Sequence, residues 1–375
     1  MSAEKKPLLS AGSFGEAIRD VGRKLASGEA GSLLVILMVA VIWTFFQFQN
    51  DRFLSAGNLT NLMLQQAAVA TISIGVVLIL LLGEIDLSVG AVSGFCAASM
   101  AVLMINRHMP PVLAMIAALG LGALVGLFNG FMITRFRIPS FVVTLAGSLV
   151  LVGLQLYVLG DTGTLNLSQP PVIGLTYTFL PPLVGWAVAL IAGAATAAFA
   201  LMGRARRKSA GLKVESMRSL VFRISFIGAA FIAMIVIVNQ DRGLPLVVCI
   251  VFALALLFSY LTERTRFGRH IFAVGGNAEA TRRAGIKIDH VRILVFVLGS
   301  TLAAAGGILA ASRLMAVNQS SGSSDLLLMA IAGPVIAGTS LFGGRGSVWS
   351  ASCSCSRSGS PTSQSALASA ATYSL

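Results

Sequence analysis

Two carboxylates lie in an otherwise apolar part of the sequence, in the string GEIDLSVG at 83–90. Glu84 and Asp86 fall between two long apolar runs, and an ionised acid at the centre of a spanning helix costs roughly 2.5–3.5 kcal/mol on insertion scales. Such acids are therefore expected to face a cavity, a partner or the membrane interface. One interpretation is a broken helix in which Glu84, Asp86 and Ser88 line the path of a polar solute. The alternative is a short turn whose acids meet water, and the residues alone favour neither.

The common catalytic motifs do not occur in the sequence. The three histidines form no H-E-x-x-H pair, and there is no Walker A loop to hold ATP. The string GAVSG that begins at Gly90 has its serine one position too late for a nucleophile elbow. We therefore predict a conduit that is not an enzyme and that binds no metal or cofactor of its own.

Composition indicates that helices in a bilayer must position these residues. Of the 375 residues, 56% are hydrophobic and 11% are charged, and the mean hydropathy is +0.87, which leaves too little polar surface for a water-soluble globule. A spanning helix needs about 20 apolar residues and pairs its own backbone groups. The fold class predicted is all-α, a polytopic bundle of about eight to ten transmembrane helices. The expected spans are 31–48, 60–82, 89–106, 112–134, 141–160, 183–202, 224–238, 244–262, 293–314 and 326–343.

Positive charge predicts one orientation for these helices. All but four of the 27 Lys and Arg residues fall in alternate segments, beginning with residues 1–30. The four exceptions are Arg52, Arg107, Arg242 and Arg313. Because basic loops are retained in the cytoplasm, we expect a cytoplasmic N-terminus and two long cytoplasmic loops, at 203–223 and 263–292. The net charge of +13 then reflects topology and attraction to anionic membrane lipid, not nucleic-acid binding.

Small residues in the fourth span predict close packing of helices. Gly122, Gly126 and Gly130 are spaced four apart, which places them on one helical face where another backbone can approach. Pro139 follows shortly after and suits the first turn of the next helix, because the N–H that it lacks is unpaired there in any residue.

The loop at 263–292 contains the residues that begin and end a short helix. Asn277 is a good N-cap, Glu279 falls in the positive first turn, and Arg282 and Arg283 fall in the last turn. Gly285 can close the helix with positive φ. We therefore predict a two-turn helix on the cytoplasmic face. It could dock on a partner protein or lie on anionic lipid, and the residues alone slightly favour lipid.

Four ordered motifs resemble the permease subunits of bacterial sugar-import ABC transporters, in the ribose, xylose and galactose branch. Their strings are GEIDLSVGAV (83–92), IPSFVVTLAG (138–147), TRFGRHIFAVGGNAEATRRAGI (265–286) and IAGTSLFGGRGSVW (336–349). Glu84, where ribose-type permeases usually have glycine, and the basic insertion at 203–223 are more similar to the xylose-type members.

This resemblance implies a multi-pass protein of the bacterial inner membrane that imports a monosaccharide, with a pentose such as xylose expected. It implies a homodimer of permeases, cytoplasmic ATPase subunits that use the ATP, and a periplasmic sugar-binding protein. It also favours a location of the segment with Glu84, Asp86 and Ser88 in the translocation region. The residues that resemble the ATPase-coupling loop are Gly276, Asn277, Glu279, Ala280, Arg282, Arg283 and Gly285.

The sequence after Trp349 departs from the family pattern. Ten of its 26 residues are serine, and the composition is typical of a disordered tail. We hypothesise a shifted reading frame, which would replace helices of the normal bundle and leave a non-functional product. The predicted organisation is thus a cytoplasmic segment at 1–30, a transmembrane domain at 31–343 and a tail at 344–375. A secondary carrier, a channel or a membrane scaffold are the competing classes, although no internal repeat of the carrier type is visible.

Overall fold

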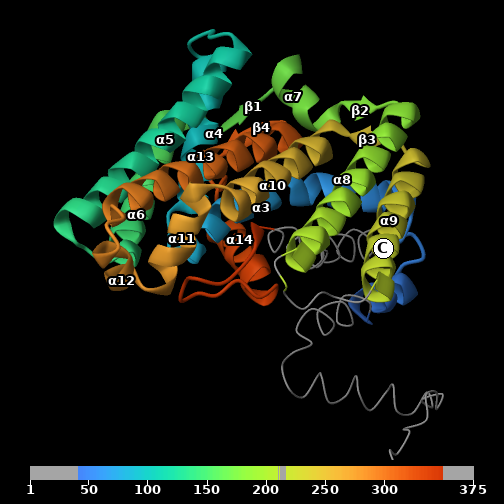
Figure 1. The fold of residues 1–375 in the computed structure, drawn as a ribbon. Helices are drawn as coiled ribbons and strands as arrows, with labels where there is room; N and C mark the ends of the chain where they lie inside the picture. The colour runs from blue at the N-terminus through green and yellow to red at the C-terminus, as the bar shows by residue number, and fades with distance from the viewer. Residues whose placement is uncertain (1–40, 210, 212–216, 349–375) are drawn as a thin grey trace, which may run out of the picture.

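The computed structural model describes residues 41–209, 211 and 217–348, which form a bundle of helices with four short strands (Figure 1). The long helices are α3 (Ala56–Leu81), α4 (Val89–Ile105), α5 (Pro111–Phe136), α6 (Ser140–Leu159), α8 (Pro182–Ser209), α9 (Met217–Asn239), α10 (Leu246–Arg264) and α13 (Ile288–Leu314). The shorter helices are η1 (Gly160–Thr162), α7 (Pro170–Tyr177), α11 (Arg266–Gly276), α12 (Ala278–Arg283) and α14 (Ser324–Ile336). The prediction of an all-α fold class is confirmed.

Six of the described helices are long and apolar enough to cross a membrane: α3, α5, α6, α8, α10 and α13. Shorter apolar helices are α4, the second half of α9, and most of α14. The predicted span at 31–48 is described only from residue 41, and residues 41–49 are helical. The segment 1–30 and the serine-rich sequence from 349 lie outside the described residues.

The expected last span at 326–343 is wrong as a full crossing. Helix α14 ends at Ile336, and its 13 residues cover about 20 Å at 1.5 Å per residue, less than the roughly 30 Å hydrocarbon core. Pro334 lies within its last turn, and Gly338 takes a φ of +98° just beyond it. These two residues end the helix, because proline removes a backbone donor and glycine permits the left-handed turn.

Both predicted cytoplasmic loops contain more helix than the sequence suggested. Helix α8 continues to Ser209 and α9 begins at Met217, so most of 203–223 extends the two helices. Arginine and lysine are good helix formers, and a helix can continue beyond the bilayer where its side chains meet water. Most of 263–292 is likewise occupied by α11 and α12.

Helices α3 and α13 form the centre of the bundle. Almost all of the apolar part of α3 is buried, and more than half of that of α13. Gly75 on α3 faces Gly299 on α13, where an added Cβ would lie 2.8 Å from the Gly299 carbonyl oxygen. This close approach of backbones is the usual result of small residues in membrane helices, where dispersion contacts replace the hydrophobic effect.

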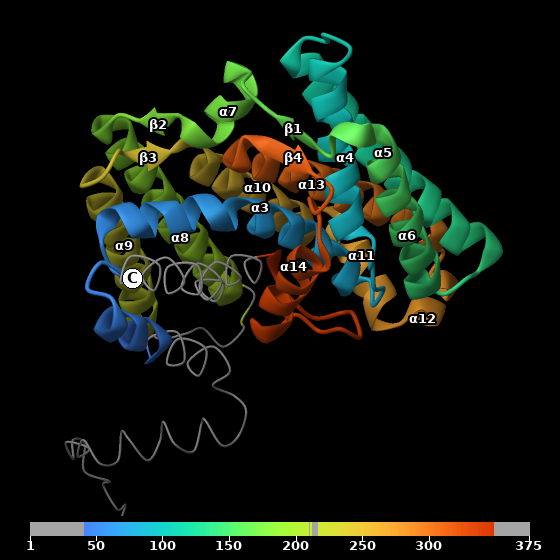
Figure 2. The same ribbon diagram turned by 180° about the vertical axis from the view of Figure 1, so that it is seen from behind.

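The peripheral helices leave apolar side chains exposed. Figures 1 and 2 show α5 and α6 along one edge of the bundle and α8 and α9 along the opposite edge. Leu149 on α6 and Leu190 on α8 are 71% and 70% exposed. In a water-soluble protein such a surface would be a large apolar patch, whereas lipid tails solvate it in a membrane.

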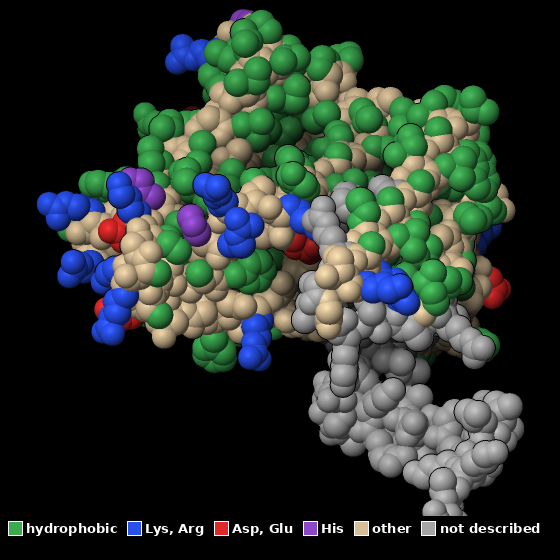
Figure 3. Space-filling view, viewed as in Figure 1, with side chains coloured by type: hydrophobic (Ala, Val, Ile, Leu, Met, Phe, Trp, Pro, Cys, Tyr) green, Lys and Arg blue, Asp and Glu red, His purple; other side chains and the backbone are tan. Residues whose placement is uncertain are grey.

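The two ends of the bundle differ in structure. At one end, β1 (Thr164–Asn166) pairs with β4 (Ala316–Asn318), and β2 (Phe179–Leu180) pairs with β3 (Leu244–Pro245), both antiparallel. We call this the strand end. Helices α11, α12 and α14 lie toward the other, the α12 end (Figures 1 and 2). Lys and Arg side chains gather there (Figure 3).

Candidate functional site

The acid-containing segment is a non-helical connection between two separate helices. Helix α3 ends at Leu81, Gly83 turns the chain with a φ of +77°, and α4 begins at Val89. We call residues 83–88 the break. It lies at the α12 end of α3, between two apolar helices.

Within the break, Asp86 is buried and bonded to Ser88. One carboxylate oxygen, Oδ1, accepts from the Ser88 backbone N–H at 2.7 Å and from its hydroxyl at 2.6 Å. Asn129 on α5 donates to the Ser88 hydroxyl oxygen at 3.2 Å. The other carboxylate oxygen, Oδ2, has no hydrogen-bond partner within the described part of the chain. Asp86 is only 4% exposed, so the interpretation of a turn whose acids meet water is wrong for this residue.

Helix α6 supplies hydrogen bonds to the backbone of the break. The Ser140 hydroxyl accepts from the N–H of Ile85 at 3.3 Å, and the Thr144 hydroxyl accepts from the N–H of Leu87 at 3.1 Å. Non-helical backbone at membrane depth is stable only where protein groups satisfy it. The first two turns of α6 therefore stabilise the non-helical backbone of the break.

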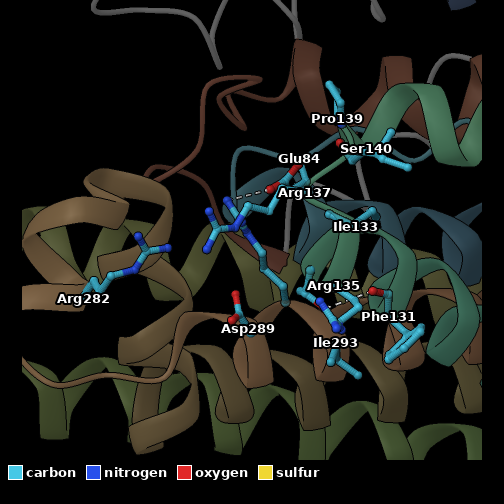
Figure 4. Close-up of a pocket in the computed structure, with 13 residues that line it drawn as sticks. Glu84, Phe131, Ile133, Arg135, Arg137, Pro139, Ser140, Arg282, Asp289 and Ile293 are labelled. Atoms are coloured by element: carbon cyan, nitrogen blue, oxygen red, sulfur yellow. Dashed lines mark hydrogen bonds and ion pairs between the residues drawn. The ribbon is translucent and has the colours of Figure 1, made fainter.

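Glu84 has a different environment from Asp86. Its carboxylate forms an ion pair with Arg292 on α13 at 3.0 Å, and the two side chains are 14% and 26% exposed. Glu84 lines a cleft of about 690 Å³ at the α12 end, into which Arg137 and Arg282 also extend (Figure 4). The structure thus brings Asp86 and Ser88 together in the protein interior and places Glu84 on the wall of this cleft.

Helix α12 matches the predicted capped helix. The Asn277 side chain accepts from the N–H of Ala280 at 2.9 Å, which is an N-cap bond. Glu279 lies in the first turn, and it pairs with Arg282 at 3.6 Å and with Arg283 at 3.5 Å. Gly285 closes the turn with a φ of +82°.

Most of the surface of α12 is exposed, and the buried side chain of Thr281 links it to α11. The exposed residues are Gly276, Asn277, Glu279, Ala280, Arg282, Arg283 and Gly285. Thr281 points inward, and its hydroxyl donates to the carbonyl oxygen of Ala273 on α11 at 2.8 Å. All seven residues that resemble a coupling loop are therefore available to a partner.

Helix α11, which the sequence analysis did not predict, connects α12 to the break. Gly275 packs against the carbonyl oxygen of Leu81, and an added Cβ would also lie 2.7 Å from the Gly344 N. The N–H of Gly344 donates to the same Leu81 oxygen at 3.0 Å. Gly83 adjoins Phe342, because a Cβ there would lie 3.1 Å from the Phe342 oxygen. Three segments distant in sequence thus meet through backbone contacts.

The glycines of α5 pack against α13. A Cβ at Gly122 would lie 2.6 Å from the Ala304 Cβ, and one at Gly130 would lie 2.8 Å from the Cα of Ile293. At Gly126 it would collide with the carbonyl oxygen of Phe296. All three therefore face one partner helix.

Several residues of the site were missed by sequence reasoning. Arg292, Asn129 and Thr144 hold the break, and Asn129 had a visible signal as a lone amide in an apolar run. Helix α11 also had a signal, since Phe267, Ile271 and Val274 follow helical spacing, and the last two are buried. No group of three His, Cys, Asp or Glu residues that could hold a metal occurs in the part of the chain that the structure describes.

The architecture defines a class: a multi-pass helical membrane protein with a buried non-helical segment between two core helices and a short capped helix exposed at one end. Residues 58–348 match the family described as "Branched-chain amino acid transport system / permease component". The chain belongs to this family of transport permeases. It is therefore a multi-pass protein of the inner membrane in bacteria, and the predicted family resemblance is confirmed.

Three relatives illustrate the similarity. The chain is 33% identical over 331 residues to the xylose transport system permease protein of Haemophilus influenzae, covering 87% of each chain. It is 34% identical over 321 residues to the xylose permease of Escherichia coli K12, covering 84% of this chain and 81% of that protein. The ribose import permease of Escherichia coli K12 is 28% identical over 324 residues, with 85% and 80% covered. No solved structure matches the chain.

Proposed function

We propose that this chain is the membrane permease of an ABC importer for a monosaccharide, a pentose such as xylose. The similarity to xylose permeases over more than four fifths of the chain supports the substrate class. In this proposal two copies form the path, separate ATPase subunits bind and hydrolyse the ATP, and a periplasmic binding protein delivers the sugar. This chain is then a transport subunit, and the hydrolysis takes place on the ATPase subunits.

The α12 end is the cytoplasmic end in this proposal. Arg242 and Arg313 lie beside β3 and β4 at the strand end, whereas Arg282, Arg283 and Arg292 lie in or beside α12. Because basic segments are retained in the cytoplasm, this distribution supports a cytoplasmic α12 end, and the proposal places the N-terminus on the same side. Anionic lipid of the inner leaflet would then surround the basic end.

The observation that carries the proposal is the connection between α12 and the break. An ATPase subunit that binds the exposed face of α12 displaces α11 through the Thr281 contact. Helix α11 then acts on the end of α3 through Gly275 and Leu81. The ion pair between Glu84 and Arg292 forms a second link, because Arg292 lies in the first turns of the helix that follows α12.

Movement of the break would change the polar groups that face the path. Glu84, Asp86 and Ser88 form the proposed substrate pathway, and the unpaired Oδ2 of Asp86 supplies an acceptor for a sugar hydroxyl once the segment opens. An Asp86→Asn variant keeps an oxygen that accepts from Ser88 but replaces the Oδ2 acceptor with an amide NH2 group, which donates. Normal uptake of radiolabelled xylose by an assembled Asp86→Asn protein would remove Asp86 from the pathway.

Copurification tests the permease function directly. The tagged chain would be coexpressed with the ATPase encoded beside its gene, and compared with a variant whose residues 277–285 are a Gly/Ser linker. We expect the ATPase to copurify with the unmodified chain and to be lost from a linker variant that still elutes as a monodisperse species. If a well-folded unmodified chain retains no ATPase, the importer proposal fails and a secondary carrier is favoured.

A further inference from the structure

The cleft at the α12 end adjoins an apolar groove between α5 and α6. The cleft has a volume of about 690 Å³ and the groove about 620 Å³, and Ile138 lines both. The cleft lies where α5 ends and α6 begins, and the groove follows the same two helices toward the strand end. The basic cleft and the apolar groove therefore adjoin at Ile138, at the outer edge of the bundle.

The cleft carries excess positive charge. Four arginines and two acids line it, and they are Arg135, Arg137, Arg282, Arg292, Glu84 and Asp289. Arg292 is paired with Glu84, and Arg282 is 3.6 Å from Glu279. Among the described residues, no ion pair joins Arg135 or Arg137 to a carboxylate. Figure 4 shows the Arg137 and Arg282 side chains extending toward the open centre from opposite sides.

The groove is suited to a hydrocarbon chain. Except for Asn129 and Gly147, its lining consists of aliphatic, aromatic and methionine side chains, and Leu124, Phe128 and Val150 among them are exposed. From Met132 to Leu121 the groove follows α5 for about 17 Å at 1.5 Å per residue, which is close to half of the roughly 30 Å hydrocarbon core. Its length therefore matches one leaflet.

We propose that the cleft and the groove together bind one anionic phospholipid, with its phosphate at Arg135 and Arg137 and one acyl chain along α5 and α6. Guanidinium groups bind phosphate oxygens through paired, charge-assisted hydrogen bonds. A free phosphate would fill the cleft alone, and a helix of another protein would fill the groove alone. A phospholipid fills both, and it places its head at the helix ends and its tail within the span.

Native mass spectrometry and lipid titration of the full chain in detergent test this site. The probes are dioleoyl phosphatidylglycerol, dioleoyl phosphatidylcholine and inorganic phosphate. The head-site variant is Arg135→Gln with Arg137→Gln. Its control is Arg52→Gln with Arg107→Gln, which removes equal charge from residues that line neither the cleft nor the groove. The groove variant is Ala146→Trp, which fills the groove from an exposed position, and its control is Leu149→Trp, on α6 outside the groove.

We expect phosphatidylglycerol to bind more tightly than phosphatidylcholine, and the head-site variant to weaken it roughly tenfold or more. Ala146→Trp should also weaken it, while both controls bind as the unmodified chain does. The proposal is overturned if the two lipids bind equally, or if the controls lower affinity as much as the paired variants. It is also overturned if inorganic phosphate competes fully and Ala146→Trp has no effect, because the site would then take a free anion.

Discussion

The break and α12 are both short polar segments, yet they are stabilised in opposite ways. The break depends on its neighbours, because Ser140, Thr144 and Arg292 from two other helices satisfy its polar groups. Helix α12 depends mainly on itself, through its Asn277 cap and the ion pairs of Glu279. The buried polar segment is thus stabilised by tertiary contacts. The exposed one is stabilised by local contacts within the helix, which leaves its surface free for a partner.

The largest effect is expected where the two regions join. Gly275→Ala places a methyl group against the Leu81 carbonyl oxygen and 2.7 Å from the Gly344 N, so the backbones must separate. We expect a lower thermal midpoint and loss of uptake. Gly276→Ala is the matched control for the thermal midpoint, because an added Cβ there meets no atom within 4 Å. Equal thermal midpoints for the two variants would contradict the contact between α11 and the end of α3.

A smaller effect is expected within the break. Asp86→Ala removes the acceptor for the N–H and the hydroxyl of Ser88, and an unsatisfied buried donor costs about 1–3 kcal/mol. The midpoint of thermal or denaturant-induced unfolding in detergent measures the loss. Asp86→Asn is the control, since its side-chain oxygen can still accept both bonds. If Asp86→Ala is as stable as Asp86→Asn, these bonds do not hold the break.

The Asn277 cap should have a local effect. Asn277→Ala removes the bond to the Ala280 N–H, and loss of an N-cap costs about 1 kcal/mol. Hydrogen exchange of the α12 amides should accelerate while that of α3 is unchanged. Asn277→Asp keeps the acceptor and adds a favourable charge at the helix N-terminus. Faster exchange throughout α3 in the alanine variant would show that α12 is not an independently capped element.

The smallest effect on stability is expected on the exposed face of α12. Arg282→Ala with Arg283→Ala removes two exposed ion pairs, which contribute about 0–1 kcal/mol. Copurification of the proposed ATPase should nevertheless fall sharply, because the proposal places these side chains against the ATPase. Arg52→Ala with Arg107→Ala serves as the charge-matched control. Unchanged copurification with the α12 variant would exclude this face as the docking surface.

The sequence predicted local features better than tertiary ones. The caps of α12 and the glycine face of α5 follow from residue spacing within single helices, and the structure has both. The ion pair between Glu84 and Arg292 joins residues more than 200 positions apart, and spacing carries no signal for it. The length of the apolar run predicted too long a helix for α14. The apolar composition continues past Pro334, but the helix ends at Ile336.

We propose that α12 and the break move together as one unit, and the ion pair between Glu84 and Arg292 allows this claim to be tested. Sugar transported per ATP hydrolysed would be measured in proteoliposomes with the ATPase and the binding protein, for Glu84→Gln, Arg292→Gln and the charge swap Glu84→Arg with Arg292→Glu. We predict that each single variant still supports ATP hydrolysis but lowers the ratio about tenfold, and that the swap restores much of it. Single variants that keep the unmodified ratio would contradict the claim.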